Sequence, residues 1–216
     1  MSSPSDFLQP DRAGFGRDPF GYSALAWHKW AMAQTVAGFP VDPSIPPTSG
    51  DLKSPVLWLA QAHALSEAAV VVIRNSPNWE QMPVPLRGVC DCHYCAVGLM
   101  LVGYSLETCL KAMHILKHGI DAYSANEKRY LHHRLEALAE FIPDLDERDR
   151  VILRVLTQFT LWAGRYPDPG SGREENVDAI FRLSERDQVT AKDLFALAAR
   201  VMKHVQLMAT NDSTLP

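Results

Sequence analysis

Proline is distributed unevenly along this chain, and it limits where long helices can form. Eleven of the 15 prolines lie in residues 1–105, and the other four lie in residues 106–216. The second half also holds 32 of the 46 charged residues. Because proline interrupts helices and charged side chains occupy their solvent-facing sides, we expect amphipathic helices in the second half. In the first half we expect irregular structure around a few apolar helices.

The composition is that of a soluble globular protein. Of the 216 residues, 47% are hydrophobic and 21% are charged. Such a chain can bury a core, which excludes wholesale disorder, a collagen-like repeat and a disulfide-stapled miniprotein. The formal net charge of −4 gives no general attraction to phosphate backbones or anionic membranes. A nucleic-acid-binding role would therefore need a local basic patch.

The sequence shows no targeting signal. Residues 1–21 are rich in Ser, Pro, Gly and Asp and have no basic segment followed by an apolar one, as a signal peptide would. The longest apolar run, residues 96–102, is far shorter than the ~20 residues that span a bilayer. We therefore expect a cytoplasmic protein without membrane association.

Three of the four cysteines lie in residues 90–95, which read CDCHYC. Cys90, Cys92 and Cys95 with His93 could in principle supply four zinc ligands. A second ligand pair from another segment is not evident, so this spacing favours small residues that lead into a buried helix. A metal site and a reactive thiol are the alternatives, and we expect neither a resident metal nor a cofactor.

Apolar residues at helical spacing recur through the chain, and no alternation long enough for a strand occurs. The class is therefore all-α, an antiparallel four-helix-type bundle with additional N-terminal helices. We expect residues 1–90 to form an N-terminal extension with one or two helices and Pro-rich loops that packs on a bundle of residues 91–216. The segments expected to be helical are 22–37, 55–73, 92–117, 124–142, a segment from 144 or 146 to 164, one or two turns in 177–183, and 190–208. Ser124 and Glu127 have the spacing of a capping box, and Thr190 and Asp193 have a similar cap-like spacing.

The expected helix over residues 92–117 and its end carry a polar row. Glu107, Lys111, His114 and His118 follow one another at spacings of four, three and four, which places them on one helical face. A solvated face with a Glu–Lys pair is the simpler interpretation. The alternatives are that part of the row points into a cleft, or that the two histidines bind a metal.

Three short motifs resemble the HEPN superfamily (higher eukaryotes and prokaryotes nucleotide-binding). Residues 103–112, GYSLETCLKA, are similar to its first core helix, Gly-φ-x-φ-Glu-x-x-φ-Lys-Ala. Residues 133–138, HRLEAL, resemble its His-Asp-Leu-x-x-Leu segment, with Arg134 in place of Asp, and residues 162–167 resemble a Gly-Arg-Tyr-Pro segment of some bacterial members. The resemblance covers about residues 94–170.

The resemblance implies a helical bundle, frequently dimeric, in a family whose members bind or cleave RNA in toxin–antitoxin or phage-defence systems. Other members are noncatalytic partners of nucleotidyltransferases. The ribonuclease members carry Arg, four to six residues, and then His near the start of the last core helix. Here Arg129 and His133 have three residues between them, as do Arg200 and His204. Arg87 and His93 have five, but they lie before the first matching helix, so the usual nuclease spacing is absent from its usual place late in the bundle.

These observations predict a polar pocket. It would combine Glu107 and Lys111 with His132 or His133, and with Arg165 and Tyr166. The family match favours His133, whereas helical geometry favours His132. If the residues converge, Glu107, Lys111, Arg165 and Tyr166 could bind an anionic ligand, and His133, His132 and Arg165 could act in metal-independent RNA cleavage. The alternative is a structural network in which Glu107 pairs with Lys111 or Arg165 and fixes the register of the bundle.

Two functions follow as hypotheses. The first is an HEPN-like bacterial protein that binds RNA or a nucleotide in a toxin or phage-defence role, supported also by Arg148, Arg150 and Arg154 in one helix. The second is a noncatalytic, homodimeric interaction module that partners a separately encoded nucleotidyltransferase or antitoxin. Net acidity and the Trp-rich N-terminal helices favour the second.

Overall fold

The computed structural model describes residues 4–211, and every regular element in that range is a helix. The prediction of an all-α protein is confirmed. The chain divides into two compact units, residues 1–57 and 58–216. The division falls inside α5 (Pro55–Arg74) and not at residue 90, so residues 58–90 belong to the same unit as the rest of the bundle.

The first unit is built from short helices that begin at aspartates. Asp11 and Asp18 each accept a backbone N–H at the start of a helix, which satisfies a donor that the helix itself cannot. Residues 22–37, predicted as one helix, are divided between two. The elements of this unit are α1 (Pro4–Leu8), α2 (Arg12–Arg17), α3 (Pro19–Ser23), α4 (Ala26–Val36) and η1 (Asp51–Lys53).

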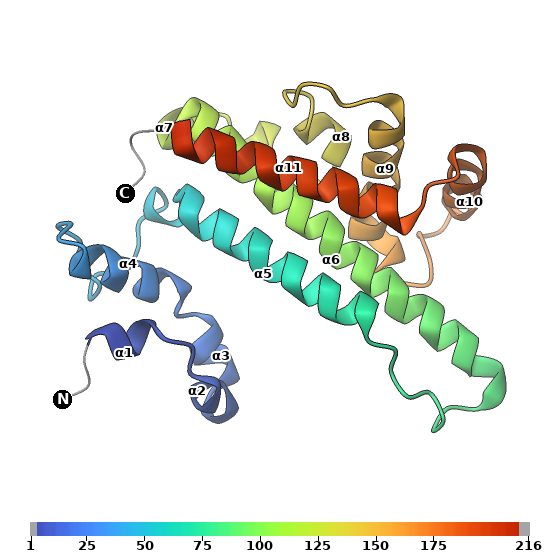
Figure 1. Ribbon diagram of the computed structural model, residues 1–216, viewed down its shortest axis with the longest axis horizontal. Coiled ribbons are helices and arrows are strands. Elements are labelled where there is room, and N and C mark those ends of the chain that lie inside the picture. The colour runs from blue at the N-terminus through green and yellow to red at the C-terminus, as the bar shows by residue number, and fades with distance from the viewer. Residues whose placement is uncertain (1–3, 212–216) are drawn as a thin grey trace. The chain divides into compact units, whose positions relative to one another are not determined.

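The second unit is organised around α6 (Val84–His118), which contacts α7, α8, α9, η3 and α11. Figure 1 shows α5, α6 and α11 as the three long helices of this unit. Leu106, Leu110 and Met113 are fully buried on α6. The remaining elements are α7 (Ile120–Ala125), η2 (Glu127–Arg129), α8 (Leu135–Leu138), α9 (Glu147–Gln158), the π-helical turn η3 (Phe159–Ala163), α10 (Glu175–Asp187) and α11 (Ala191–Asn211).

Two predicted helix starts are confirmed by their caps. Asp146 and Asp149 form a reciprocal capping box at the start of α9. Thr190 and Asp193 exchange equivalent hydrogen bonds at the start of α11. Between them, α10 is longer than the one or two turns expected.

The helix predicted over residues 124–142 is wrong. Ser124, expected to cap it, lies inside α7 and donates its hydroxyl proton to the Ile120 carbonyl. The chain then makes one 3-10 turn, runs without regular structure to residue 134 and forms only the single turn of α8. Tertiary hydrogen bonds override local helix propensity here, because the Leu135 N–H donates to the Thr157 hydroxyl.

The start of α6 also differs from the prediction. It begins at Val84, eight residues before the expected start at residue 92, with Pro85 in its first turn. Proline is tolerated there because the first N–H groups of a helix have no intrahelical partner. The cysteines therefore lie within α6 and do not precede it.

Helices α5 and α6 are long and apolar enough to cross a membrane by length and composition alone. Their most apolar windows have mean hydropathies of 1.7 and 1.4. In α6 the buried residues lie between Gly98 and Ile115, and 28% of its most apolar window is buried. In α5 only Ala62 and Ala69 are buried, and the Ala62 carbonyl accepts a hydrogen bond from Ser105 of α6.

Close packing between α6 and η3 depends on glycine. A Cβ on Gly103 would lie 2.5 Å from Thr160 Cγ2, and one on Gly164 would lie 2.4 Å from Met100 Cβ and 3.0 Å from the Ala96 carbonyl oxygen. Real Cβ atoms do not approach so closely. The two helical segments can therefore lie in contact only because both positions lack a side chain.

We predict that Gly164→Ala destabilises the fold by about 1–3 kcal/mol, because the added methyl group meets backbone and Cβ atoms that cannot rotate away. The free energy of unfolding is measured by urea denaturation. Gly88→Ala, in the open first turns of α6, is the matched control and should leave stability unchanged or raise it by about 0.5–1 kcal/mol. Equal stability of the two variants would show that Gly164 is not needed for the contact.

Candidate functional site

A buried carboxylate lies at the centre of the site. Glu107 and Lys111 are one turn apart on α6 and are only 6% and 8% exposed. Lys111 Nζ lies 2.7 Å from Glu107 Oε1, and His133 Nδ1 lies 2.8 Å from Glu107 Oε2. Both oxygens of the carboxylate are thus occupied, one by an ammonium and one by an imidazole. We refer to these three residues as the Glu107 cluster.

His133 is oriented by its surroundings and remains accessible. Its side chain is 41% exposed, and the ring of Tyr104 meets it edge-on at 6.0 Å between centroids. Tyr104 is itself held by a hydrogen bond from its hydroxyl to the Thr160 carbonyl. Because Nδ1 donates to Glu107, the neutral ring has its lone pair on Nε2. An imidazole held in this way can accept and return a proton.

His132 lies on the same non-helical segment but has a different environment. Its Nδ1 accepts a hydrogen bond from the Arg134 backbone N–H, which places the proton of the neutral ring on Nε2. Burial and the positive charges of Arg134 and Lys111 lower the pKa of His132. It is therefore a neutral N–H donor near pH 7.

His132 lines a pocket of about 420 Å³ between α8 and the end of α6, which we call the basic pocket. Lys117 and Arg129 lie on its other walls, and Glu140 is its one carboxylate. Three full positive charges against one negative charge make this a local basic patch. The titratable and charged lining residues are His114, Lys117, His118, Arg129, Tyr130, His132, Arg134 and Glu140.

His114 and His118 form a stacked pair on this pocket, with 5.9 Å between ring centroids and 11° between ring planes. His114 Nε2 donates to the Leu138 carbonyl, so its Nδ1 is the unprotonated nitrogen. That atom is buried without a hydrogen-bond partner among the described residues. Burial lowers the pKa of His114, so it too is neutral near pH 7.

A second cavity of about 430 Å³, which we call the arginine pocket, adjoins the first. The two share Arg134, Ala137 and Glu140 as lining residues. Arg150 and Arg154 also line it. Arg154 donates to Glu136 and Glu147 at 2.9 and 2.6 Å, and the Glu147 hydrogen bond raises its pKa most.

The predicted convergence is found for part of the set only. Glu107, Lys111 and His133 come together, which matches both the ligand-binding interpretation and the structural-network alternative. Arg165 instead donates to the Leu161 carbonyl and lies 5.5 Å from the centre of the Tyr166 ring. Arg165 and Tyr166 follow the π-helical turn, and Tyr166 lines a different pocket.

The two candidate histidines have different surroundings. Glu107 binds His133, the position that the family match favours, and His132 lines the basic pocket. The helical argument for His132 was wrong because neither residue is in a helix. Sequence reasoning missed Lys117 and Arg129 as site residues. For Arg134 the sequence did hold a signal, because this residue stands where the His-Asp-Leu-x-x-Leu motif has aspartate.

The cysteines do not assemble a metal centre. Cys90 and Cys92 lie on α6, where a rotation of about 100° per residue directs them to nearly opposite sides. Among residues 4–211, no three His, Cys, Asp or Glu side chains are grouped so that they could hold a metal ion. Burial and the charge of Asp91 raise the pKa of Cys95, which disfavours its reactive thiolate form.

The arginines predicted as a basic face have separate roles. Arg148 pairs with Asp193 of α11 at 2.7 Å and also donates to the Gln188 carbonyl. Arg154 pairs with two glutamates, whereas Arg150 lines the arginine pocket. Two of the three therefore hold helices together.

No family model matches the sequence, and no curated protein or solved structure matches the chain. The HEPN resemblance therefore rests on the three motifs alone.

We predict that Glu107→Gln lowers the free energy of unfolding by about 3–5 kcal/mol, because it leaves the buried Lys111 ammonium without its counter-charge. The double variant Glu107→Gln/Lys111→Met should recover part of that loss, since no uncompensated charge remains. Arg182→Met, which breaks an exposed pair with Asp178, is the control and should have almost no effect. An equally small effect of Glu107→Gln in urea denaturation would contradict the prediction.

Proposed function

We propose that this chain is an HEPN-like protein that binds phosphate groups of RNA or of a nucleotide in the basic pocket. The observation that carries the proposal is the concentration of Lys117, Arg129 and Arg134 around one cavity in a chain whose net charge is −4. Phosphate contacts supply most of the affinity of nucleic-acid-binding proteins. This pocket supplies the local basic patch that the overall charge lacks.

The chemistry of the pocket favours an anion over a metal ion. Guanidinium groups bind phosphate oxygens with two parallel hydrogen bonds, and Lys117 adds a compact positive charge. The Nε2 proton of neutral His132 adds a donor without a charge. The imidazoles of His114 and His132 have lowered pKa values, so the charge that attracts an anion comes from the lysine and the arginines.

The Glu107 cluster gives the same region an acid–base group. The charge of Lys111 contributes to the lowered pKa of His132, which lines the pocket, and Glu107 orients His133 with its Nε2 free of that hydrogen bond. An imidazole in this state can take the proton of an RNA 2′-hydroxyl, which is the first step of metal-independent cleavage. A toxin or phage-defence role in the cytoplasm, with an antitoxin partner, rests on the family resemblance alone.

We predict that a labelled single-stranded RNA binds the full chain, and that Arg129→Ala/Arg134→Ala weakens binding by removing two phosphate contacts. In fluorescence anisotropy, the binding affinity of the double variant should fall less steeply with salt concentration, by the equivalent of ~2 phosphate contacts. Lys203→Ala, an exposed cation on α11, is the matched control and should bind like the unchanged chain. If RNA, mononucleotides and inorganic phosphate all fail to bind, or if both variants bind equally, the proposal is overturned.

The same RNA separates binding from catalysis. Incubation with a chelator present should yield cleaved RNA if the Glu107 cluster is catalytic, and His133→Ala should then abolish cleavage while binding persists. Uncleaved but bound RNA assigns the site to binding alone.

A second candidate, a homodimeric interaction module, is favoured by the outer face of α5. Ala60, Ala64, Ala68 and Val71 are exposed on the side opposite the buried Ala62 and Ala69. Small residues in such a row allow two helices to approach closely, and a second copy of the same face is self-complementary about a two-fold axis. A nucleotidyltransferase as a further partner rests on the resemblance alone.

We predict that the chain elutes as a dimer of 24.1 kDa subunits in size-exclusion chromatography with light scattering. Ala64→Glu should convert it to a monomer, because the carboxylate would be buried in the helix contact. Glu67→Gln, a neighbouring exposed position, is the control. A monomeric unchanged chain would refute this second candidate.

A further inference from the structure

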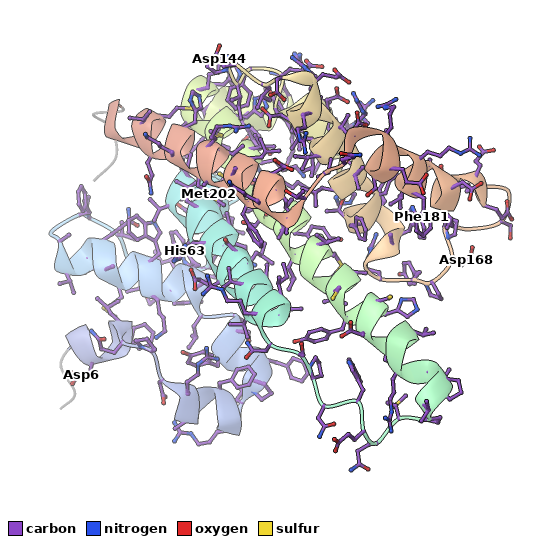
Figure 2. All side chains as sticks on the ribbon, turned by 45° about the vertical axis from the view of Figure 1, so that its right-hand side comes forward. Asp6, His63, Asp144, Asp168, Phe181 and Met202 are labelled. Carbon is purple, nitrogen blue, oxygen red and sulfur yellow. The ribbon has the colours of Figure 1, made fainter. Side chains whose placement is uncertain are left out.

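A third cavity, which we call the aromatic pocket, lies between η3 and α10 and has a volume of about 330 Å³. Trp162 and Tyr166 provide its aromatic walls, and Gln158, Asn176, Asp168 and Arg173 are the polar lining residues. Figure 2 labels Asp168 on the connection that leads from η3 to α10. The site predicted from the sequence did not account for this pocket, although its Tyr166 belongs to the Gly-Arg-Tyr-Pro segment.

Local hydrogen bonds hold the indole of Trp162 and the backbone of Tyr166. Trp162 Nε1–H donates to Gln158 Oε1 at 3.1 Å, one helical turn earlier. The backbone N–H of Tyr166 donates to the Trp162 carbonyl at 2.8 Å, which fixes the start of the segment relative to the indole. Tyr166 is 57% exposed, and the Arg165 guanidinium lies over its ring. A planar, accessible aromatic surface is thus presented beside a side-chain amide.

The aromatic pocket is linked to the site already described by shared lining residues. It shares Gln158 and Asn176 with the arginine pocket. The arginine pocket in turn shares Arg134, Ala137 and Glu140 with the basic pocket. We call this series of three neighbouring cavities the groove; Lys117 and Arg129 line the cavity at one end, and Trp162 and Tyr166 line the cavity at the other.

The groove has the chemistry of a single-stranded nucleic-acid path. Bases stack on aromatic side chains without regard to sequence, and amides offer both a donor and an acceptor to the edge of a base. Arg173 supplies a cation at the aromatic end for a flanking phosphate. Each of the three cavities has the volume of a small-molecule site, so the series fits linked nucleotides better than one.

We infer that the aromatic pocket stacks one base of a single-stranded oligonucleotide whose phosphates occupy the basic pocket, with Gln158 and Asn176 contacting the edge of that base. This inference rests on the proposed function for its ligand but concerns different residues. Tyr166 is then a binding residue, at a subsite separate from the Glu107 cluster.

Uncharged nucleosides test the stacking subsite without phosphate. Adenosine or cytidine at millimolar concentration should shift the NMR signal of the Trp162 indole N–H, assigned by its loss in Trp162→Phe. Ribose alone should not shift it, and Asn176→Ala should weaken the response. If no nucleoside moves this signal, the inference is overturned whatever the result with RNA.

A single-stranded oligonucleotide and its abasic counterpart test the link between the subsites. Tyr166→Ala should weaken binding of the normal strand about tenfold and bind both strands alike, because one stacked base is lost. Phe181→Ala, an exposed aromatic on α10 outside the pocket, is the matched control and should retain the difference. If the unchanged chain binds both strands equally, the inference is refuted but the proposed function is not. If oligonucleotide binding does not depend on Arg134, the proposed function is refuted. The nucleoside experiment then decides whether the aromatic pocket is a base-stacking subsite.

Discussion

The buried carboxylate of Glu107 is the constraint on which the site depends. A negative charge in the middle of the core helix is costly unless both of its oxygens are hydrogen-bonded. Lys111 can reach one oxygen from the same helix, but the other needs a donor from elsewhere, and His133 supplies it. The chain around residue 133 must therefore lie against α6.

This requirement shapes the neighbouring segment. With His133 directed to Glu107, the adjacent His132 and Arg134 line the basic pocket instead. The hydrogen bond from the Leu135 N–H to Thr157 then anchors the segment to α9. One buried charge thus explains both the acid–base cluster and the cationic surface next to it.

A second constraint links the cluster to the far end of the groove. Gly103, one turn before Glu107, allows η3 to contact α6 at Thr160, and Gly164 allows the chain to leave that contact beside Met100. The turn that follows brings Tyr166 to the aromatic pocket. Gly103 and Gly164 therefore lie in the same packing contact, between α6 and η3. Each belongs to one of the motifs that resemble the HEPN family, and their contact positions both the Glu107 cluster and the aromatic pocket.

The sequence predicted the elements that depend on local chemistry. Apolar periodicity identified α5, α9 and α11, a cap-like spacing identified the start of α11, and the four-residue spacing identified the pair of Glu107 and Lys111. It did not predict the path of residues 127–142, because hydrogen bonds to α6 and α9 decide that path. For the same reason the lining of the basic pocket could not be predicted, and the expected convergence of Arg165 failed because a π-helical turn redirects the chain after α9.

At the level of composition, the net charge of −4 disfavours an anionic ligand, but the positions of the acidic residues in the structure reduce that effect at the basic pocket. Many carboxylates serve the fold. Asp193 accepts hydrogen bonds from Thr190 at the start of α11 and pairs with Arg148, and these contacts lower the pKa of Asp193 to about 2. Asp149 caps α9 and pairs with Arg200. These acids neutralise cations that hold helices together, and they do not line the basic pocket. Electrostatic attraction at short range depends on the charges within about one Debye length, ~8 Å at physiological salt, so the local excess around Arg134 decides what that pocket can bind.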